Sequence, residues 1–161
     1  MESGQQGAFQ VRLLGAGQVR LALPLARLLY PSLTEPQWAA YAAGPGGEAA
    51  PKRRVLVACN PAGYLHGLCT LCGGIDLRHG RALDVEDVVV VSFLDAGSVT
   101  RALLDGIEDL ARRDGFSEIR VHLPDGDLPH RQAVADTLGS GGHVRIAACY
   151  AKLLPPRPAA P

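Results

Sequence analysis

Ten segments of the chain show the hydrophobic patterning of regular secondary structure. Period-two alternation, or a short β-branched run between turn residues, predicts strands at residues 9–14, 54–59, 64–77, 83–93, 118–123 and 143–154. Apolar residues spaced three and four apart predict helices at residues 23–30, 35–43, 99–111 and 130–138. The order β, α, α, β, β, β, α, β, α, β predicts an α/β or α+β domain with a mixed, mostly antiparallel sheet.

One helix start carries a specific signal. Thr34 can accept a hydrogen bond from the main chain of Gln37, and the Gln37 side chain can return one to Thr34. Pro36 suits the first turn, because its missing N–H has no helical partner there. A capping box is therefore predicted at the start of the helix at 35–43. Pro24, in the helix predicted at 23–30, is also tolerable only in a first turn.

A short polar loop joins the strand at 83–93 to the helix at 99–111. This helix places its apolar residues on one face and has two arginines in its last turn, followed by Gly115. Another strand is predicted directly afterwards, at 118–123. A β–α–β unit of this kind is almost always a right-handed crossover, so its two strands should be parallel.

The composition is that of an ordinary globular domain. The chain has 161 residues, of which 47% are hydrophobic and 20% charged. One domain is expected over residues 9–154, between a flexible N-terminus at 1–8 and a Pro-rich tail at 155–161.

Charge and targeting signals exclude several classes of partner. Sixteen basic residues balance sixteen acidic ones, so charge gives no reason to expect binding to nucleic acid or to an anionic membrane. No apolar run is long enough to span a bilayer, and the first ten residues lack a secretory signal. A cytoplasmic protein is expected, with Cys59, Cys69, Cys72 and Cys149 as reduced thiols. The CxxC pair has no second ligand pair, which disfavours zinc.

The segment VEDVVVVSFLDAGSVTRALL, from Val85 to Leu104, resembles the GNAT superfamily, the GCN5-related N-acetyltransferases. The usual form of the family here is close to iEDlvVxpeyRgkGiGraLl, and the two align without a gap. The predicted order of elements also matches across residues 9–154. The resemblance implies a GNAT fold and an N-acetyltransferase. Its co-substrate would be acetyl-CoA, and its acceptor a small-molecule or peptide amine. A homodimer stays open.

The resemblance also implies a site for acetyl-CoA. In the family, one strand carries the pantetheine arm, and the loop Arg/Gln-x-x-Gly-x-Gly/Ala opens a helix whose backbone N–H groups bind the pyrophosphate. The corresponding residues here are Val88, Val90, Ala96, Gly97, Ser98, Val99, Thr100 and Arg101.

Every signature position of this loop is substituted. Asp95 stands where the family has Arg, and Ser98 and Thr100 stand where it has glycine. The backbone donors and two hydroxyl groups would remain. Asp95, however, brings a negative charge toward a phosphate, and like charges repel. Weak binding of acetyl-CoA is therefore predicted.

Glu86 matches the acid that serves as the base in relatives with the iED pattern, so it is the predicted catalytic residue. Strict alternation would place Glu86 on the same face as Val88 and Val90, with Asp87 opposite. The alternative role for Glu86 is structural, as a solvated acid or the partner of an arginine on a neighbouring strand.

Three possibilities stay open at this point, and the third is a domain that works beside another protein, which supplies the missing contacts. Glu86 and the unbroken length of the loop favour an acetyltransferase. The loop substitutions favour a non-catalytic GNAT-fold binding or regulatory module with weak or no acetyl-CoA binding, and so does Leu138, which stands where the family often has the Tyr that protonates the CoA thiolate. Trp38 and Tyr41 are predicted core residues. The strands at 83 and 118 should splay apart and leave a cleft.

Overall fold

The computed structural model describes residues 9–44, 53–92, 95–123 and 130–146. Its elements are β1 (Gln10–Leu13), α1 (Val19–Leu29), α2 (Glu35–Ala43), β2 (Arg53–Cys59), β3 (Leu65–Asp76), β4 (Gly80–Val90), α3 (Ala96–Arg113), β5 (Glu118–Val121) and α4 (Arg131–Ser140). This order matches the prediction up to the last strand. Residues 143–146, where that strand was expected to begin, form no strand, and residues 147–154 lie outside the described ranges.

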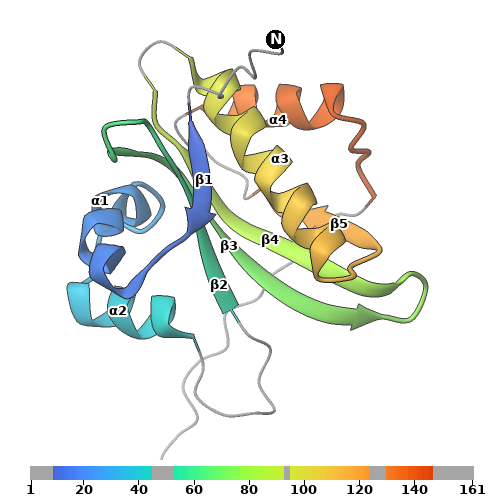
Figure 1. Ribbon diagram of the computed structural model, residues 1–161, viewed down its shortest axis with the longest axis horizontal. Coiled ribbons are helices and arrows are strands. Elements are labelled where there is room, and N and C mark those ends of the chain that lie inside the picture. Colours follow the sequence, from blue (N-terminus) through green and yellow to red (C-terminus); the bar gives the residue numbers. More distant parts are fainter. Residues whose placement is uncertain (1–8, 45–52, 93–94, 124–129, 147–161) are drawn as a thin grey trace, which may run out of the picture.

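The described strands form one sheet in the order β1-β2-β3-β4-β5. Neighbouring strands are antiparallel from β1 to β4, and β4 and β5 are parallel. The β4–α3–β5 unit is therefore the predicted crossover, and the fold class is α+β as expected. The long β3–β4 hairpin extends past the end of α3 (Figure 1).

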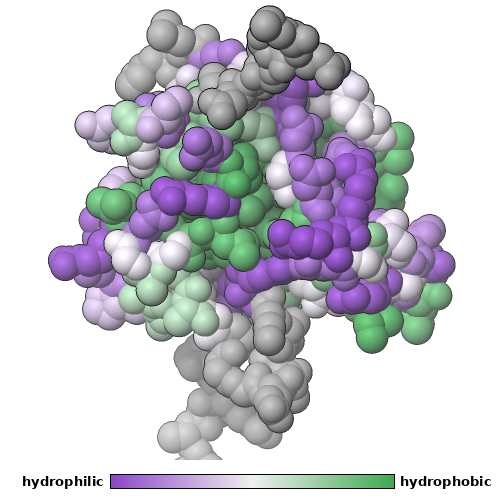
Figure 2. Space-filling model, viewed as in Figure 1, coloured by the Kyte–Doolittle hydropathy of each residue, from purple (hydrophilic) through white to green (hydrophobic). Residues whose placement is uncertain are grey.

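The two faces of the sheet are covered by different helices (Figure 1). One apolar cluster packs α3 and α4 against β-strand residues such as Leu71, Leu83 and Val90. The other packs α1 and α2 against residues such as Val57, Leu68 and Val89. Apolar side chains gather in the middle of the face seen in Figure 2, with hydrophilic side chains around them. None of the described helices has the length and apolarity that crossing a bilayer requires.

Helix α1 begins earlier than predicted. The sequence suggested a start at residue 23, with Pro24 in the first turn, but the helix begins at Val19 and contains Pro24 in its interior. Pro24 lies on the exposed side, where water can satisfy the carbonyl that loses its helical N–H partner. Burial of Ala22, Leu23 and Ala26 on the opposite side outweighs this local cost.

The other helix signals act as predicted. Thr34 and Gln37 form the capping box at the start of α2. Helix α3 ends at Arg113, and Gly115, two residues later, has a φ of 74°. The N–H of Gly115 donates to the carbonyl of Arg112, and the N–H of Phe116 donates to that of Ala111, as in a Schellman motif.

Helix α3 also approaches β1 unusually closely. A Cβ added at Gly106 would lie 2.5 Å from Cγ1 of Val11. Only glycine allows this approach, which sets the position of α3 on the sheet.

Candidate active site

β4 contains a bulge in the middle of the sheet. Two of its residues, Asp87 and Val88, face Cys69 alone, because the β3–β4 register shifts at this point. Asp87 has a φ of 52°, in the left-handed region that glycine usually occupies in such bulges. A non-glycine residue persists there only where its surroundings stabilise it.

Three hydroxyl groups provide this stabilisation. Tyr30 donates to Oδ1 of Asp87 at 2.5 Å, and Tyr41 and Thr70 donate to Oδ2 at 2.6 and 2.9 Å. These four residues are called the Asp87 cluster below. A hydrogen bond to a charged group contributes roughly 1.5–3 kcal/mol, so three of them exceed the roughly 1–3 kcal/mol of backbone strain. Arg53 lies over the Tyr41 ring, 4.3 Å from its centroid.

The Asp87 carboxylate keeps both phenols protonated. Its hydrogen bond, followed by partial burial and its charge, raises the pKa of Tyr30 well above the usual value. Burial, followed by the hydrogen bond to Asp87, raises the pKa of Tyr41 to about 12. Because Asp87 already accepts three hydrogen bonds, it is suited to fixing the bulge and the tyrosines rather than to taking a proton from a substrate.

Glu86 lies on the same face of the sheet as the Asp87 cluster. It faces Thr70 in the register, and its charge contributes to the raised pKa of Tyr30. It is half-buried and makes no hydrogen bond or ion pair with the described residues. Its oxygens are therefore open to a proton or a substrate.

The alternation predicted for this part of β4 is wrong. Val88 and Val90 pack in the α3 cluster, on the face opposite Glu86, and Asp87 lies on the same face as Glu86. The bulge adds one residue between Glu86 and the valines, and one extra residue reverses every side chain that follows.

β4 and β5 part beside this bulge. Their register runs from Ala82 opposite Glu118 to Val85 opposite Val121, and the N–H of His122 donates to the carbonyl of Val85 at 2.8 Å. Beyond that point β4 has no β5 partner among the described residues. The predicted splay is not seen within β5, because all four of its residues, Glu118–Val121, pair with β4. A cleft between the two strands therefore stays a prediction.

The side chain of Asp95 caps the start of α3. Oδ1 of Asp95 accepts the N–H of Ser98 at 2.8 Å, and Oδ2 accepts the Ser98 hydroxyl. These hydrogen bonds lower the pKa of Asp95 below its usual value. The N-terminus of a helix attracts anions, and at the N-terminus of α3 the Asp95 carboxylate already occupies this position.

The loop side chains expected to help a phosphate point elsewhere. The Ser98 hydroxyl is engaged by Asp95, and the Thr100 hydroxyl donates to the carbonyl of Ala96 at 2.8 Å inside the structure. Val99 is fully buried in the α3 cluster, so only its backbone faces the loop.

Three donors remain at this end of α3. The N–H groups of Ala96 and Gly97 have no partner among the described residues, and the exposed Arg101 follows one turn later. Val90 is fully buried and Val88 partly buried, so Val90 can offer a ligand only its main chain. These three donors are enough to hold one phosphate, and the negative charge of Asp95 opposes its binding.

α4 supplies no phenol. Leu138 is 8% exposed and packs in the cluster shared with α3. Two phenols lie in the opposite layer: Tyr30, whose pKa the charge of Glu86 helps to raise, and Tyr41, which donates to Asp87.

Comparison with known proteins places this geometry in a common architecture. No protein-family model matches the chain, and no curated protein matches its sequence. Among solved structures, the ribosomal-protein-alanine N-acetyltransferase of Brucella melitensis is similar with a TM-score of 0.64 and 18% identity, over 93% of this chain and 99% of that one. An acetyltransferase of Trypanosoma brucei has a TM-score of 0.64 and 19% identity, over 90% and 99%. The aminoglycoside N-acetyltransferase AAC(6')-Iy, solved with CoA, has a TM-score of 0.68 and 12% identity, over 94% and 99%.

The chain has the GNAT fold. The expected order of elements and the β4–α3–β5 unit belong to that fold. The bulge in β4 and the start of α3 then lie at the two positions that the sequence resemblance assigned to catalysis and to acetyl-CoA.

Sequence reasoning missed most of the Asp87 cluster. Tyr41 was predicted as core beside Trp38; the Trp38 side chain is buried, but the Tyr41 hydroxyl reaches Asp87. Tyr30 and Thr70 carried no signal. An acid inside a run of valines was the available clue, since a carboxylate in a sheet interior needs donors from neighbouring elements.

Proposed function

We propose that this protein transfers an acetyl group from acetyl-CoA to an amine, with Glu86 as the general base. The supporting observation is that Glu86, which has no partner among the described residues, lies next to the bulged half of β4, which pairs with β3 but has no described partner on the β5 side. The GNAT fold provides the frame for this chemistry.

The chemistry follows from the requirements of acetyl transfer. The acceptor must lose a proton to attack, and Glu86 takes it directly or through a water molecule. The amine nitrogen then bonds to the thioester carbonyl carbon, and a backbone N–H of the bulged segment stabilises the oxyanion. When the C–S bond breaks, protonated Glu86 or solvent returns a proton to the thiolate, since Leu138 cannot.

Acetyl-CoA binds weakly in this proposal. The N–H groups of Ala96 and Gly97 and the guanidinium of Arg101 attract a phosphate, while Asp95 repels it and occupies the N–H of Ser98. Binding should therefore tighten at low salt only if the attraction to Arg101 exceeds the repulsion from Asp95.

Release of free CoA tests the proposal directly. The purified chain is incubated with acetyl-CoA and a panel of amines that includes amino acids, peptides with free N-termini, polyamines and aminoglycosides, and a thiol reagent detects CoA. At least one amine should release CoA above the rate of acetyl-CoA alone, and Glu86→Gln should strongly reduce that excess at neutral pH.

One observation favours a second function, a non-catalytic module with the GNAT fold. The Asp95 cap occupies part of the anion site at the start of α3. Calorimetry with acetyl-CoA and CoA at low and moderate salt distinguishes the two. Absence of binding at low salt, together with no released CoA from any amine, would favour the module.

A further inference from the structure

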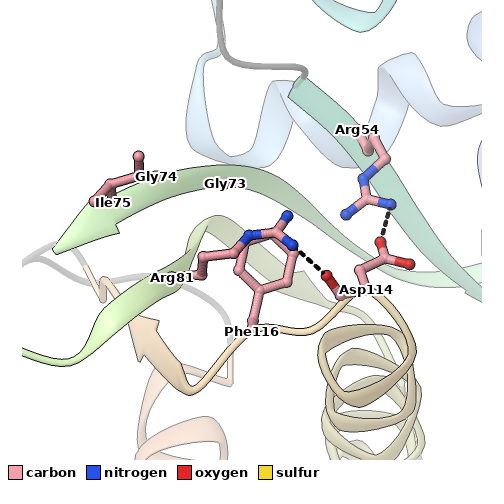
Figure 3. A pocket seen from close by; sticks show the side chains of 7 residues that line it. All are labelled: Arg54, Gly73, Gly74, Ile75, Arg81, Asp114 and Phe116. Atoms are coloured by element: carbon pink, nitrogen blue, oxygen red, sulfur yellow. Dashed lines mark hydrogen bonds and ion pairs between the residues drawn. The ribbon is translucent and has the colours of Figure 1, made fainter.

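We propose that the cavity between the β3–β4 hairpin and the C-terminal end of α3 binds an aromatic oxyanion, which is a carboxylate or phosphate carried on an aromatic ring. This cavity has a volume of about 630 Å³ and is lined by Arg54, Gly73, Gly74, Ile75, Arg81, Asp114 and Phe116 (Figure 3). It lies apart from Glu86 and Asp95, and the inference does not depend on acetyl transfer.

The cavity wall carries an excess of positive charge. Arg54 donates from Nη1 to the Asp114 carboxylate at 2.6 Å, and Arg113 donates from Nε to the same carboxylate at 3.2 Å. Arg81 donates from Nη1 to the main-chain carbonyl of Asp114 at 2.8 Å. Two of these guanidinium groups, those of Arg54 and Arg81, line the cavity, whose lining residues carry one carboxylate, that of Asp114. The end of the helix dipole adds only about half a negative charge, so the positive charge is not balanced.

Most N–H groups of Arg54 and Arg81 also have no acceptor among the described residues. A guanidinium carries five N–H groups, and the described residues accept one hydrogen bond from Arg54 and one from Arg81. Both arginines line the cavity, from different strands, as Figure 3 shows. Planar guanidinium groups match the paired oxygens of carboxylates and phosphates.

The rest of the wall suits a flat apolar body. The Arg81 guanidinium lies over the Phe116 ring, 4.7 Å from its centroid. A Cβ at Gly73 would lie 2.8 Å from Cζ of Phe116, so glycine is needed for the ring to rest on β3. Ile75, two residues along β3, is 86% exposed. An aromatic ligand can therefore pack against Ile75 and Phe116 with its charge toward the arginines.

Fastening α3 to the sheet explains only part of this arrangement. One arginine would neutralise Asp114, whereas both Arg54 and Arg81 reach it from the cavity wall. Asp84 and Asp76, two acids of the hairpin, are both paired with Arg120, at 3.0 and 3.1 Å. Among the residues that line the cavity, Asp114 is the only acid, so the remaining donors of Arg54 and Arg81 have no further carboxylate there.

Phenyl phosphate is a suitable probe. In an NMR titration of the full chain at low salt, it should shift the amide signals of Gly73, Gly74 and Phe116 in a saturable manner. Benzoate tests the carboxylate source, inorganic phosphate the head group alone, and phenol the ring alone. Phenol should not bind, and inorganic phosphate should bind at least fivefold more weakly than phenyl phosphate.

Variants give the decisive comparison. Arg81→Gln should weaken phenyl phosphate at least tenfold, whereas Arg12→Gln, an equal loss of charge on the exposed β1, should change the affinity less than twofold. Asp114→Asn removes the competing carboxylate and should tighten binding, a result that a misfolded variant would not give. The proposal fails if these amides do not shift, if Arg81→Gln binds like the wild type, or if Asp114→Asn weakens binding while its spectrum stays folded.

Discussion

Asp95 has two opposed effects at one position. It stabilises the start of α3 through its hydrogen bonds from Ser98, and it places a negative charge where a phosphate would bind. A change at this residue therefore trades helix stability against binding of acetyl-CoA.

We predict that Asp95→Arg tightens acetyl-CoA binding roughly tenfold at low salt, because one repulsion is removed and one attraction is added. Asp95→Asn is the matched control, since Asn still caps a helix but carries no charge. It should give an intermediate affinity. Calorimetric titration at two salt concentrations measures both, and the gain should shrink as salt rises. Equal affinities for all three proteins would show that no phosphate lies near residue 95.

The second prediction concerns Glu86. If it is the base, Glu86→Gln should lower the acetylation rate most near neutral pH, and rising pH should partly restore the rate as free amine accumulates. Rates measured across pH for both proteins test this. Glu108→Gln, which alters an acid paired with Arg112 on the surface of α3, should leave the profile unchanged. A loss of the same size at every pH would indicate a structural role for Glu86.

At the residue scale, the sequence predicted chemistry better than geometry. Alignment with the GNAT pattern showed that Asp95 stands in place of Arg and that Leu138 stands in place of Tyr. The left-handed conformation of Asp87 did not, because it depends on hydroxyl groups from α2, β3 and the residue after α1.

At the scale of elements, the contact between α3 and β1 sets where the helix start lies. We predict that Gly106→Ala destabilises the protein by about 1–2 kcal/mol. The new methyl group would lie 2.5 Å from Cγ1 of Val11, and overpacking outweighs the gain of roughly 1 kcal/mol in helix propensity. Urea unfolding measures the difference.

Gly139→Ala is the matched control. This glycine lies in α4 with nothing within 4 Å of an added Cβ. The substitution should therefore be neutral or stabilise by up to about 1 kcal/mol. If both changes stabilise the protein, α3 can move away from β1 without cost.

Local signals and register differ in how well the sequence specifies them. The capping box of Thr34 and Gln37 predicted the start of α2 correctly, since both partners are three residues apart. The bulge in β4 was missed because it is defined by pairing with Cys69 on another strand. The early start of α1 was missed for a related reason, since the pattern does not reveal that Pro24 faces solvent.

At the scale of the whole molecule, the Asp87 cluster connects two layers. α1 and α2 contact the sheet through one apolar cluster, and Tyr41 adds a polar link from α2 to β3 and β4. Loss of this link should therefore loosen the whole α1–α2 layer.

We predict that this link weakens at alkaline pH. The pKa of Tyr41 is raised in the folded state to about 12, from about 10 in an unfolded chain. The stabilisation is then complete below about pH 10 and is lost as pH rises toward 12. Tyr41→Phe should cost about 1–3 kcal/mol at neutral pH, and the difference from the wild type should shrink over that alkaline range.

Urea unfolding at several pH values tests this prediction. Tyr64→Phe is the control, because the Tyr64 side chain is 70% exposed and its hydroxyl makes no hydrogen bond with the described residues. It should follow the wild type throughout. If the loss in free energy of unfolding caused by Tyr41→Phe stays constant to pH 12, the hydrogen bond that the Tyr41 hydroxyl donates does not hold the layers together.

The order of elements was enough to predict the architecture. A single β–α–β crossover beside antiparallel strands leaves few arrangements, and the sheet has the expected one. The convergence of arginines on Asp114 was beyond the sequence, because Arg54 and Arg81 come from separate strands and meet at the end of α3.

The Asp95 carboxylate that caps α3 is covalently attached beside the helix start that it binds. A group held on its own chain acts at an effective concentration of roughly millimolar or more, so incoming phosphate always meets a resident competitor. If acetyl-CoA binds here as proposed, the same attachment would complete the helix end when acetyl-CoA is scarce. A weakly bound co-substrate would in turn add little to folding stability. Under the proposal, a shortage of acetyl-CoA should thus empty the site and leave the protein folded, with its abundance uncoupled from the supply.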